Sequence, residues 1–253
     1  MSICIFCGKN RKRNREHIFP VWLQTDLGIS GEELRIFTGS QPELKRKLNF
    51  GSHLAGHVCE ECNSGWMSTL ETSARPIIET LLEDNNRRAL SHTETSTLAM
   101  WIWKTVLTLH SASVDEKIIP SYHYELAFNQ KIPGCFMIHI AHLENRLDTP
   151  SWIQNRNWLG AERHLSGDAL INALRLTYRI TIGFGHLAAR VIYFPLKLPL
   201  FPLEEGVISI YPPAKDIIWP PEISIEDLWE MDSGVVVRPS FPESNLNDGI
   251  FSE

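Results

Sequence analysis

Two short stretches of the sequence decide the fold: Cys4-Ile-Phe-Cys7-Gly8 near its start and Cys59-Glu-Glu-Cys62-Asn63 further along. Each contains a C-x-x-C pair, whose two thiolates lie close enough on a tight turn to reach one ion. Two such pairs together provide the four sulfur ligands of a tetrahedral zinc site. Four thiolates leave no open position on the ion, so we expect the zinc to stabilise the fold and to take no part in a reaction. The predicted structural zinc ligands are Cys4, Cys7, Cys59 and Cys62.

Two alternatives to zinc stay open for the paired cysteines. One is a redox C-x-x-C, although that motif does not need a second copy of itself, and the other is a spacing that arose by chance. Disulfides rarely persist in a cytoplasm, which favours metal over a crosslink there. The fifth cysteine, Cys135, lies in an apolar stretch, where we expect a small buried hydrophobic residue.

The composition excludes several classes of protein. The 253 residues are 43% hydrophobic and 21% charged, close to the globular mean and unlike disordered, collagen-like or coiled-coil chains. The apolar runs at 98–109 and 191–203 are interrupted by lysine or proline and are too short to span a bilayer, so no membrane partner is expected. The N-terminus lacks the order of a secretory signal, which predicts a cytoplasmic protein.

Charge is distributed unevenly along the chain. The net charge is −6, yet residues 1–50 carry nine Lys or Arg against five Asp or Glu. A locally basic segment is compatible with contact to phosphates over a limited surface, although such a run is as often a solvated face. The candidate nucleic-acid contacts are Lys12, Arg13, Arg15, Lys45, Arg46 and Lys47.

The segment between the two cysteine pairs contains an acidic residue next to a histidine, Glu16-His17. Pro20 then opens a short predicted helix that ends before Gly28, with proline in its first turn and glycine just past its end. His17 therefore stands at a junction between elements. A lone histidine is usually a structural residue, but an acid and histidine pair enclosed by two zinc knuckles is rarer.

This combination resembles the HNH endonucleases, in their branch with a treble-clef zinc site. The resemblance extends from Cys4 to about Glu71, and it implies a ββα-metal module that hydrolyses phosphodiester bonds. It rests on Cys4, Cys7, Glu16, His17, Cys59, Cys62 and Asn63.

The resemblance also implies roles for single residues. His17, at the end of the first strand, is expected to be the general base that activates water. Glu16 and Asn63 are expected to bind a catalytic divalent ion, Mg²⁺ or Mn²⁺, because carboxylate and amide oxygens suit a hard cation. Strand alternation alone, however, directs Glu16 away from His17.

The sequence departs from the family at the middle Asn of HNH, which orients the base. Counting back from Asn63, that position holds Leu54, which can neither donate nor accept a hydrogen bond. A shifted His53 or His57, or the backbone, can take the supporting role, and we favour His57 because it precedes Val58-Cys59 on the expected second strand. The departure leaves open a catalytically inactive treble-clef module that binds nucleic acid or protein.

The rest of the chain predicts a second part. A helical pattern over 63–82, with a kink or break expected at Pro76, is followed by a polar boundary. The spacing of Ser91 and Glu94 predicts a capping box before an apolar helical stripe over 98–109. Short strands are expected at 135–143, 174–184, 187–194 and 207–211. Most tryptophans of this part are expected in the core.

Together these patterns predict an α+β protein. Residues 1–83 form the HNH-like zinc module, and residues 90–253 form a helical and β-rich domain that selects the target, docks a partner or forms a homo-oligomer. The expected activity is metal-dependent cleavage of nucleic acid, DNA rather than RNA, in restriction or anti-phage defence. An RNase-type toxin or defence effector is a third hypothesis.

Overall fold

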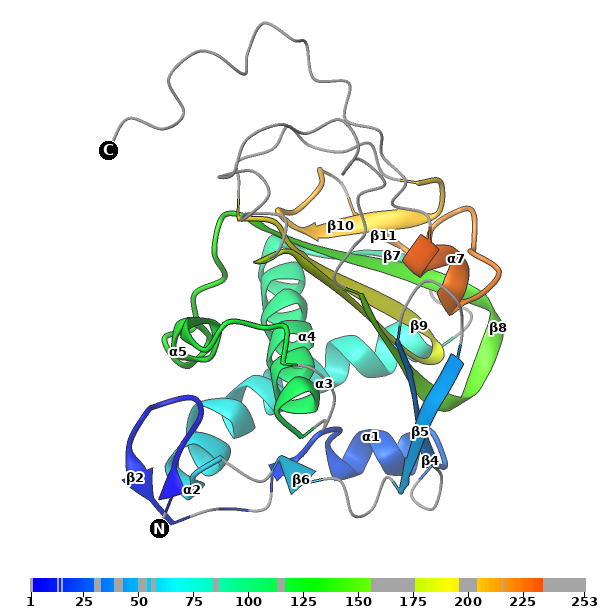
Figure 1. Cartoon of the computed structure of the whole chain (residues 1–253). Coiled ribbons are helices and arrows are strands. Elements are labelled where there is room, and N and C mark those ends of the chain that lie inside the picture. The colour runs from blue at the N-terminus through cyan, green and yellow to red at the C-terminus, as the bar shows by residue number, and fades with distance from the viewer. Residues whose placement is uncertain are drawn as a thin grey trace, which may run out of the picture.

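In the computed structural model of the chain, two long strands organise a mixed architecture of helices and sheet (Figure 1). The structure describes residues 2–12, 14, 16–29, 58–83, 87–112, 117–155, 176–195, 204–215 and 217–232, together with the backbone of 33–38, 43–49, 54–55 and 233. Helix and strand both contribute, as the α+β prediction requires. No helix among these residues is both long enough and apolar enough to cross a bilayer.

The main sheet is built on β8 (Phe136–Asn155) and β9 (Tyr178–Tyr193), which pair antiparallel along most of their length. The other edge of β8 pairs twice: near its start with β10 (Val207–Tyr211), antiparallel, and near its end with β4 (Glu33–Thr38), parallel. The strand β5 (Glu43–Asn49) pairs antiparallel with β4. Two strands from the N-terminal part of the chain, β4 and β5, therefore belong to the sheet of the C-terminal part.

One helix forms the centre of the core. α4 (His92–Ala112) is buried along most of its length, and α3 (Ser68–Leu82), α5 (Tyr122–Phe128) and β9 pack against it. Its start has the predicted capping box: the Glu94 backbone N–H donates to Ser91 Oγ, and the Ser91 backbone N–H donates to the Glu94 carboxylate. These bonds satisfy donors that a helix N-terminus leaves unpaired.

A single hydrophobic cluster runs from Cys4 to Trp219 and includes side chains from both predicted parts. The division at residues 84–89 stays a prediction, but the two parts share this core. Trp101, Trp103, Trp152 and Trp219 are all buried, as expected for core aromatics. Cys135 is half-buried against the same cluster.

The opposite face of the sheet has its own smaller core. There α7 (Leu228–Ser233) packs on β9 and β8 through residues such as Leu228 and Met231. Asp232 is held by a bidentate pair from Arg179 and by bonds from Asn155 and Thr181, all of them buried. These four donors attach the C-terminal helix to the sheet.

Several predicted boundaries are changed by the structure. α1 (Val21–Asp26) follows Pro20 and ends before Gly28, whose φ is +70°, as the sequence predicted. Pro76, in contrast, lies inside α3 and does not end it. The predicted strands at 174–184 and 187–194 are one strand, β9, and β8 extends to Asn155, well past the predicted end at Leu143. β7 (Arg88–Ala89) pairs antiparallel with β11 (Ile218–Trp219) in a separate two-stranded sheet.

Candidate metal centre

The four predicted zinc ligands lie together. Cys4 and Cys7 sit between β1 (Ser2–Ile3) and β2 (Asn10–Arg11), an antiparallel hairpin. The Gly8 N–H donates to the Cys4 carbonyl, and Gly8 has a φ of +66°, a conformation that glycine adopts without strain. Cys59 immediately precedes the short helix α2 (Glu60–Cys62), and Cys62 is its last residue. Among the described residues, these four cysteines are the only group of three or more potential ligands whose donor atoms cluster, and the sulfurs lie within 4.8 Å of one another.

The spacing of the sulfurs fits zinc. Cys4 Sγ lies 3.8 Å from Cys62 Sγ, and Cys7 Sγ lies 3.7 Å from Cys59 Sγ. Four bonds of about 2.3 Å in a tetrahedron separate the sulfurs by about 3.8 Å. The contact with Cys62 lowers the pKa of Cys4 to about 4, and the same contact raises the pKa of Cys62. The donor set and its geometry therefore suit a structural zinc ion.

The turn that holds Cys4 and Cys7 is anchored in the protein by an aromatic side chain. Phe6, between the two cysteines of the first pair, is buried and makes edge-on contacts with Trp66 and Tyr124 at 5.5 Å between ring centroids. Trp66 follows the second cysteine pair, and Tyr124 lies on α5. Phe6 therefore packs the first cysteine pair against two segments that lie far away in the chain.

His17 lies on a strand of two residues. β3 (Glu16–His17) pairs antiparallel with β6 (Leu54–Ala55), and the register sets Glu16 opposite Ala55 and His17 opposite Leu54. As predicted, His17 ends its strand. The second strand, however, lies earlier than the predicted Val58-Cys59, and Leu54 is the cross-strand neighbour of His17.

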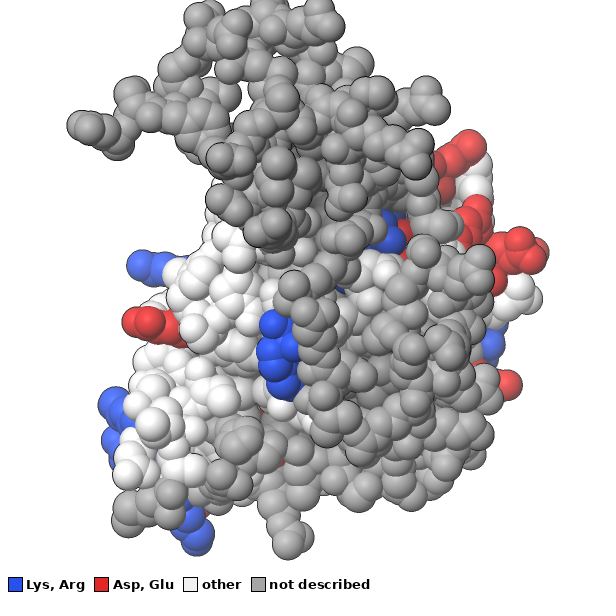
Figure 2. Space-filling view, viewed as in Figure 1, with Lys and Arg blue, Asp and Glu red and all other residues white. Residues whose placement is uncertain are grey.

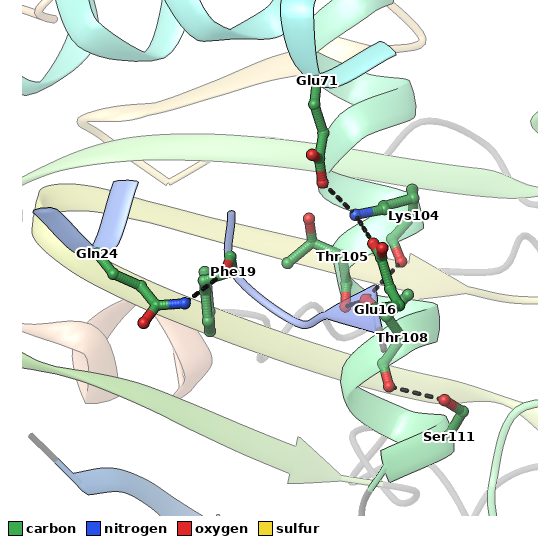
Figure 3. A network of polar contacts seen from close by, with 8 residues as sticks. All are labelled: Glu16, Phe19, Gln24, Glu71, Lys104, Thr105, Thr108 and Ser111. Carbon is green, nitrogen blue, oxygen red and sulfur yellow. Dashed lines mark hydrogen bonds and ion pairs between the residues drawn. The ribbon is translucent and has the colours of Figure 1, made fainter. Parts of the chain in front are cut away.

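The exit from β3 is fixed by a buried amide. Gln24 on α1 donates from Nε2 to the carbonyl oxygen of Phe19 at 2.7 Å, which holds the turn between His17 and α1 (Figure 3). Before β3, the Asn14 N–H donates to the carbonyl of Val58, next to Cys59. The half-buried His17 is thus held between two anchored turns.

Glu16 takes part in a buried ion cluster. Its Oε1 lies 2.7 Å from Nζ of Lys104 on α4, and the same ammonium donates to Glu71 Oε1 on α3 at 2.6 Å (Figure 3). Burial raises the pKa of Glu16, although Lys104 opposes the shift. Burial alone lowers the pKa of Lys104, but the two carboxylates outweigh it and raise that pKa.

Asn63 directly follows the second cysteine pair, at the start of an irregular helical turn. It begins η2 (Asn63–Met67), a π-helical turn between α2 and α3, and Gly65 inside that turn has non-helical angles (φ −94°, ψ −113°). The Asn63 side chain is half-exposed. Such irregular turns are frequent at functional sites.

The remaining predicted site residues are only partly described. His53, His57, Arg13 and Arg15 lie outside the described residues, and only the backbone is described for Lys45, Arg46 and Lys47 on β5. Lys12 is exposed. On the face in Figure 2, acidic side chains of the described residues gather on the side of α7, whereas basic ones stand apart from one another.

The sequence did not reveal the partners of Glu16. Lys104 stands within the apolar stripe over 98–109, and a lysine in a buried stripe signals that acidic partners must face it. Glu71 lies on the helix that packs against that stripe. Comparisons with family models, curated proteins and solved structures gave no significant match to the chain.

Proposed function

We propose that the chain is a metal-dependent endonuclease of the HNH type that hydrolyses phosphodiester bonds in DNA. One arrangement supports the proposal: β3 with His17 pairs antiparallel with β6, a helical segment follows Cys59, and the cysteine cluster ties that segment to the β1–β2 hairpin. Along the chain α1, β4 and β5 stand between β3 and β6, so the likeness to a ββα-metal module rests on the pairing of β3 with β6 and on the helix that follows β6. The zinc ligands would hold the two parts of this module in place and leave the reaction to other residues.

In this proposal His17 is the general base. A neutral imidazole nitrogen takes the proton from a water molecule as that water attacks phosphorus. The half-exposed position of His17 at the end of β3 allows it to meet a substrate. The anchored turns on both sides limit its movement, which favours a fixed angle of attack.

A divalent ion, Mg²⁺ or Mn²⁺, would supply positive charge to the non-bridging and leaving oxygens of the phosphate. Asn63 fits the role of ligand, because its side chain is half-exposed and an amide oxygen suits such ions. Glu16 does not fit it in this geometry, because its carboxylate is buried against Lys104. We therefore assign no step of the reaction to Glu16.

The basic residues of the N-terminal part would contact phosphates. Lys12 is exposed, and the stretch Lys45 to Lys47 lies on β5, at one end of the strand order of the main sheet. Contact between positive side chains and phosphates would be independent of sequence and sensitive to salt. The part after residue 90 would select the target or dock a partner, in restriction or anti-phage defence.

A second candidate function is a module that binds nucleic acid or protein without cleaving it. Two observations favour it: Leu54, which cannot orient a histidine, lies opposite His17, and the carboxylate of Glu16 is engaged by Lys104. Such a module would keep the zinc site and bind without a divalent ion.

Cleavage of supercoiled plasmid by the purified full chain tests the proposal, with Mg²⁺, Mn²⁺ or EDTA. We expect metal-dependent nicking that is lost in His17→Ala and kept in His92→Ala, which changes an exposed histidine on the first turn of α4. Both variants must retain zinc. Cleavage of RNA but not of DNA would identify RNA as the substrate. Equal inertness of wild type and His17→Ala on DNA and RNA, with binding retained, would favour the second candidate.

A further inference from the structure

Lys104 is the only lysine among the described residues that is fully buried. It reaches from the central helix α4 to two acidic side chains on different elements: Glu16 on β3 and Glu71 on α3 (Figure 3). The side chain of Glu16 is 5% exposed and that of Glu71 is 23% exposed, so the contact with Glu16 is the more deeply buried.

Stability alone does not explain this cluster. Transfer of charges from water into a protein costs free energy that their mutual attraction seldom exceeds, and apolar side chains of similar size often stabilise a core equally well. Here two acidic side chains face one ammonium, so ionisation of both would leave an excess of one negative charge. Buried ionic groups can instead serve to select one arrangement of the elements that carry them.

On one side, the cluster fixes the orientation of β3. This strand has only two residues, so its backbone pairing with β6 constrains its twist weakly. Side chains alternate along a strand, and Glu16 is buried toward α4 while His17 is half-exposed. An anchor on Glu16 therefore determines the face on which His17 stands.

On the other side, the cluster holds the helix that follows Asn63. Glu71 lies on α3, beyond the irregular turn at Gly65. That turn interrupts regular helical geometry, so the contact with Glu71 holds α3 itself and not the side chain of Asn63. Lys104 therefore contacts one acidic side chain on the strand of His17 and another on the helix α3.

We propose that Lys104 is a positioning residue: through Glu16 and Glu71 it sets the orientation of His17 relative to α3, and Glu16 serves this cluster instead of binding the catalytic ion. This inference rests on the proposed nuclease function. It assigns to Glu16 a role different from the metal ligand that the family resemblance implies.

The first test measures cleavage rate against Mg²⁺ concentration in the full chain. In Glu16→Gln and Lys104→Met we expect a maximal rate at least about tenfold lower, with a half-saturating Mg²⁺ concentration within about twofold of wild type. The double variant should be no slower than Lys104→Met, because the two residues act as one unit. A tenfold higher half-saturating Mg²⁺ concentration in Glu16→Gln would restore the ligand role and overturn the proposal.

The second test does not depend on activity. The ring signals of His17 in ¹H–¹³C spectra should shift in Lys104→Met and Glu16→Gln, whereas those of His92 should stay unchanged. Asp232→Asn, which alters a buried ion pair on the other face of the sheet, should leave both rings unchanged. Unchanged His17 signals in the cluster variants would overturn the positioning role, whether or not the wild type cleaves DNA.

Retention of zinc and of the circular dichroism spectrum shows which variants fold. If Lys104→Met does not fold, Glu16→Gln and Glu71→Gln carry both tests, since they keep the shape of the side chains and an acceptor for the ammonium. We expect a smaller effect from Glu71→Gln than from Glu16→Gln, because Glu71 acts on the helix and not on the strand of His17. A larger effect of Glu71→Gln than of Glu16→Gln on the His17 ring would contradict the proposal that Lys104 acts on His17 through Glu16.

Discussion

His17 and Leu54 are directly opposite each other in the antiparallel pair of β3 and β6. Under the proposed HNH-type function, Leu54 stands where that family has an asparagine that orients the base. The register therefore puts the residue that departs from the HNH pattern directly opposite the proposed base.

The variant Leu54→Asn is expected to accelerate cleavage. An amide opposite the imidazole can form one hydrogen bond, worth about 1 kcal/mol, which corresponds to a rate about fivefold higher. The gain should be absent in Leu54→Ala and in the double variant Leu54→Asn with His17→Ala, measured on plasmid under single-turnover conditions. An equal gain in Leu54→Ala would show that loss of the leucine, and not the new amide, is responsible.

Zinc content should follow the four clustered cysteines and not Cys135. We expect Cys4→Ser and Cys62→Ser to lose most of the bound zinc and to unfold at lower temperature, because a structural zinc contributes folding free energy directly. Cys135→Ser should keep one zinc ion per chain, as measured by elemental analysis. Replacement of zinc by Co²⁺ should give the visible absorption of tetrahedral thiolate ligation, and an octahedral spectrum would contradict the proposed site.

The buried Asp232 is expected to matter for stability. Asp232→Ala leaves the guanidinium of Arg179 without its carboxylate in the protein interior, so we expect a loss of about 3–5 kcal/mol in the free energy of unfolding. Asp148→Ala is the matched control, because Asp148 is 89% exposed and its contact with Arg146 lies at the surface. Urea unfolding should show no measurable change for this control.

His110 predicts a loss of stability in mild acid. Burial, followed by the nearby charge of Lys117, lowers the pKa of His110 to about 3, and its Nε2 accepts the backbone N–H groups of Ile118 and Ile119. Below pH 6.5 the unfolded chain binds a proton at this histidine while the folded chain does not. The folded state should therefore lose about 1.4 kcal/mol for each pH unit from 6.5 down toward the folded pKa.

The variant His110→Gln isolates this contribution. At pH 7 it should be less stable than wild type, because a glutamine cannot match the shape of the ring that joins the Ile118 and Ile119 N–H groups on one side to the Tyr124 hydroxyl on the other. The difference should shrink as pH falls to 5, by about 1.4 kcal/mol per unit, since only the wild type carries the unfavourable histidine. Urea unfolding of both proteins with saturating zinc measures the gap, and a gap that is constant with pH would refute the assignment.

Local patterns in the sequence predicted local structure well. The C-x-x-C spacing, the capping box of Ser91 and Glu94, and the proline and glycine around α1 all act through bonds within a few residues. The strand of Glu16 and His17 also follows its prediction. Pairing across long distances was less accessible: the basic stretch Lys45 to Lys47 gave no sign that it lies on a strand of the main sheet.

The candidate site shows the same division. The cysteines and His17 could be identified because each belongs to a motif in its own neighbourhood. The partner of Glu16 could not, because Lys104 belongs to a helix far along the chain, and only the three-dimensional packing of α4 brings it to β3. In a sequence, a glutamate next to a histidine gives the same pattern whether it binds a metal ion or a buried lysine.

The parallel pairing of β4 with β8 sets an order for folding during synthesis. Arg35 pairs with Ser151, so the N-terminal hairpin of β4 and β5 leaves the ribosome long before its partner strand exists. Zinc can bring the two knuckles together early, as soon as Cys62 has emerged, but the open edge of β4 must wait for β8 and is meanwhile exposed to other chains. Rapid production of the protein should therefore favour aggregation through this hairpin, and slower translation should raise the yield of folded chain.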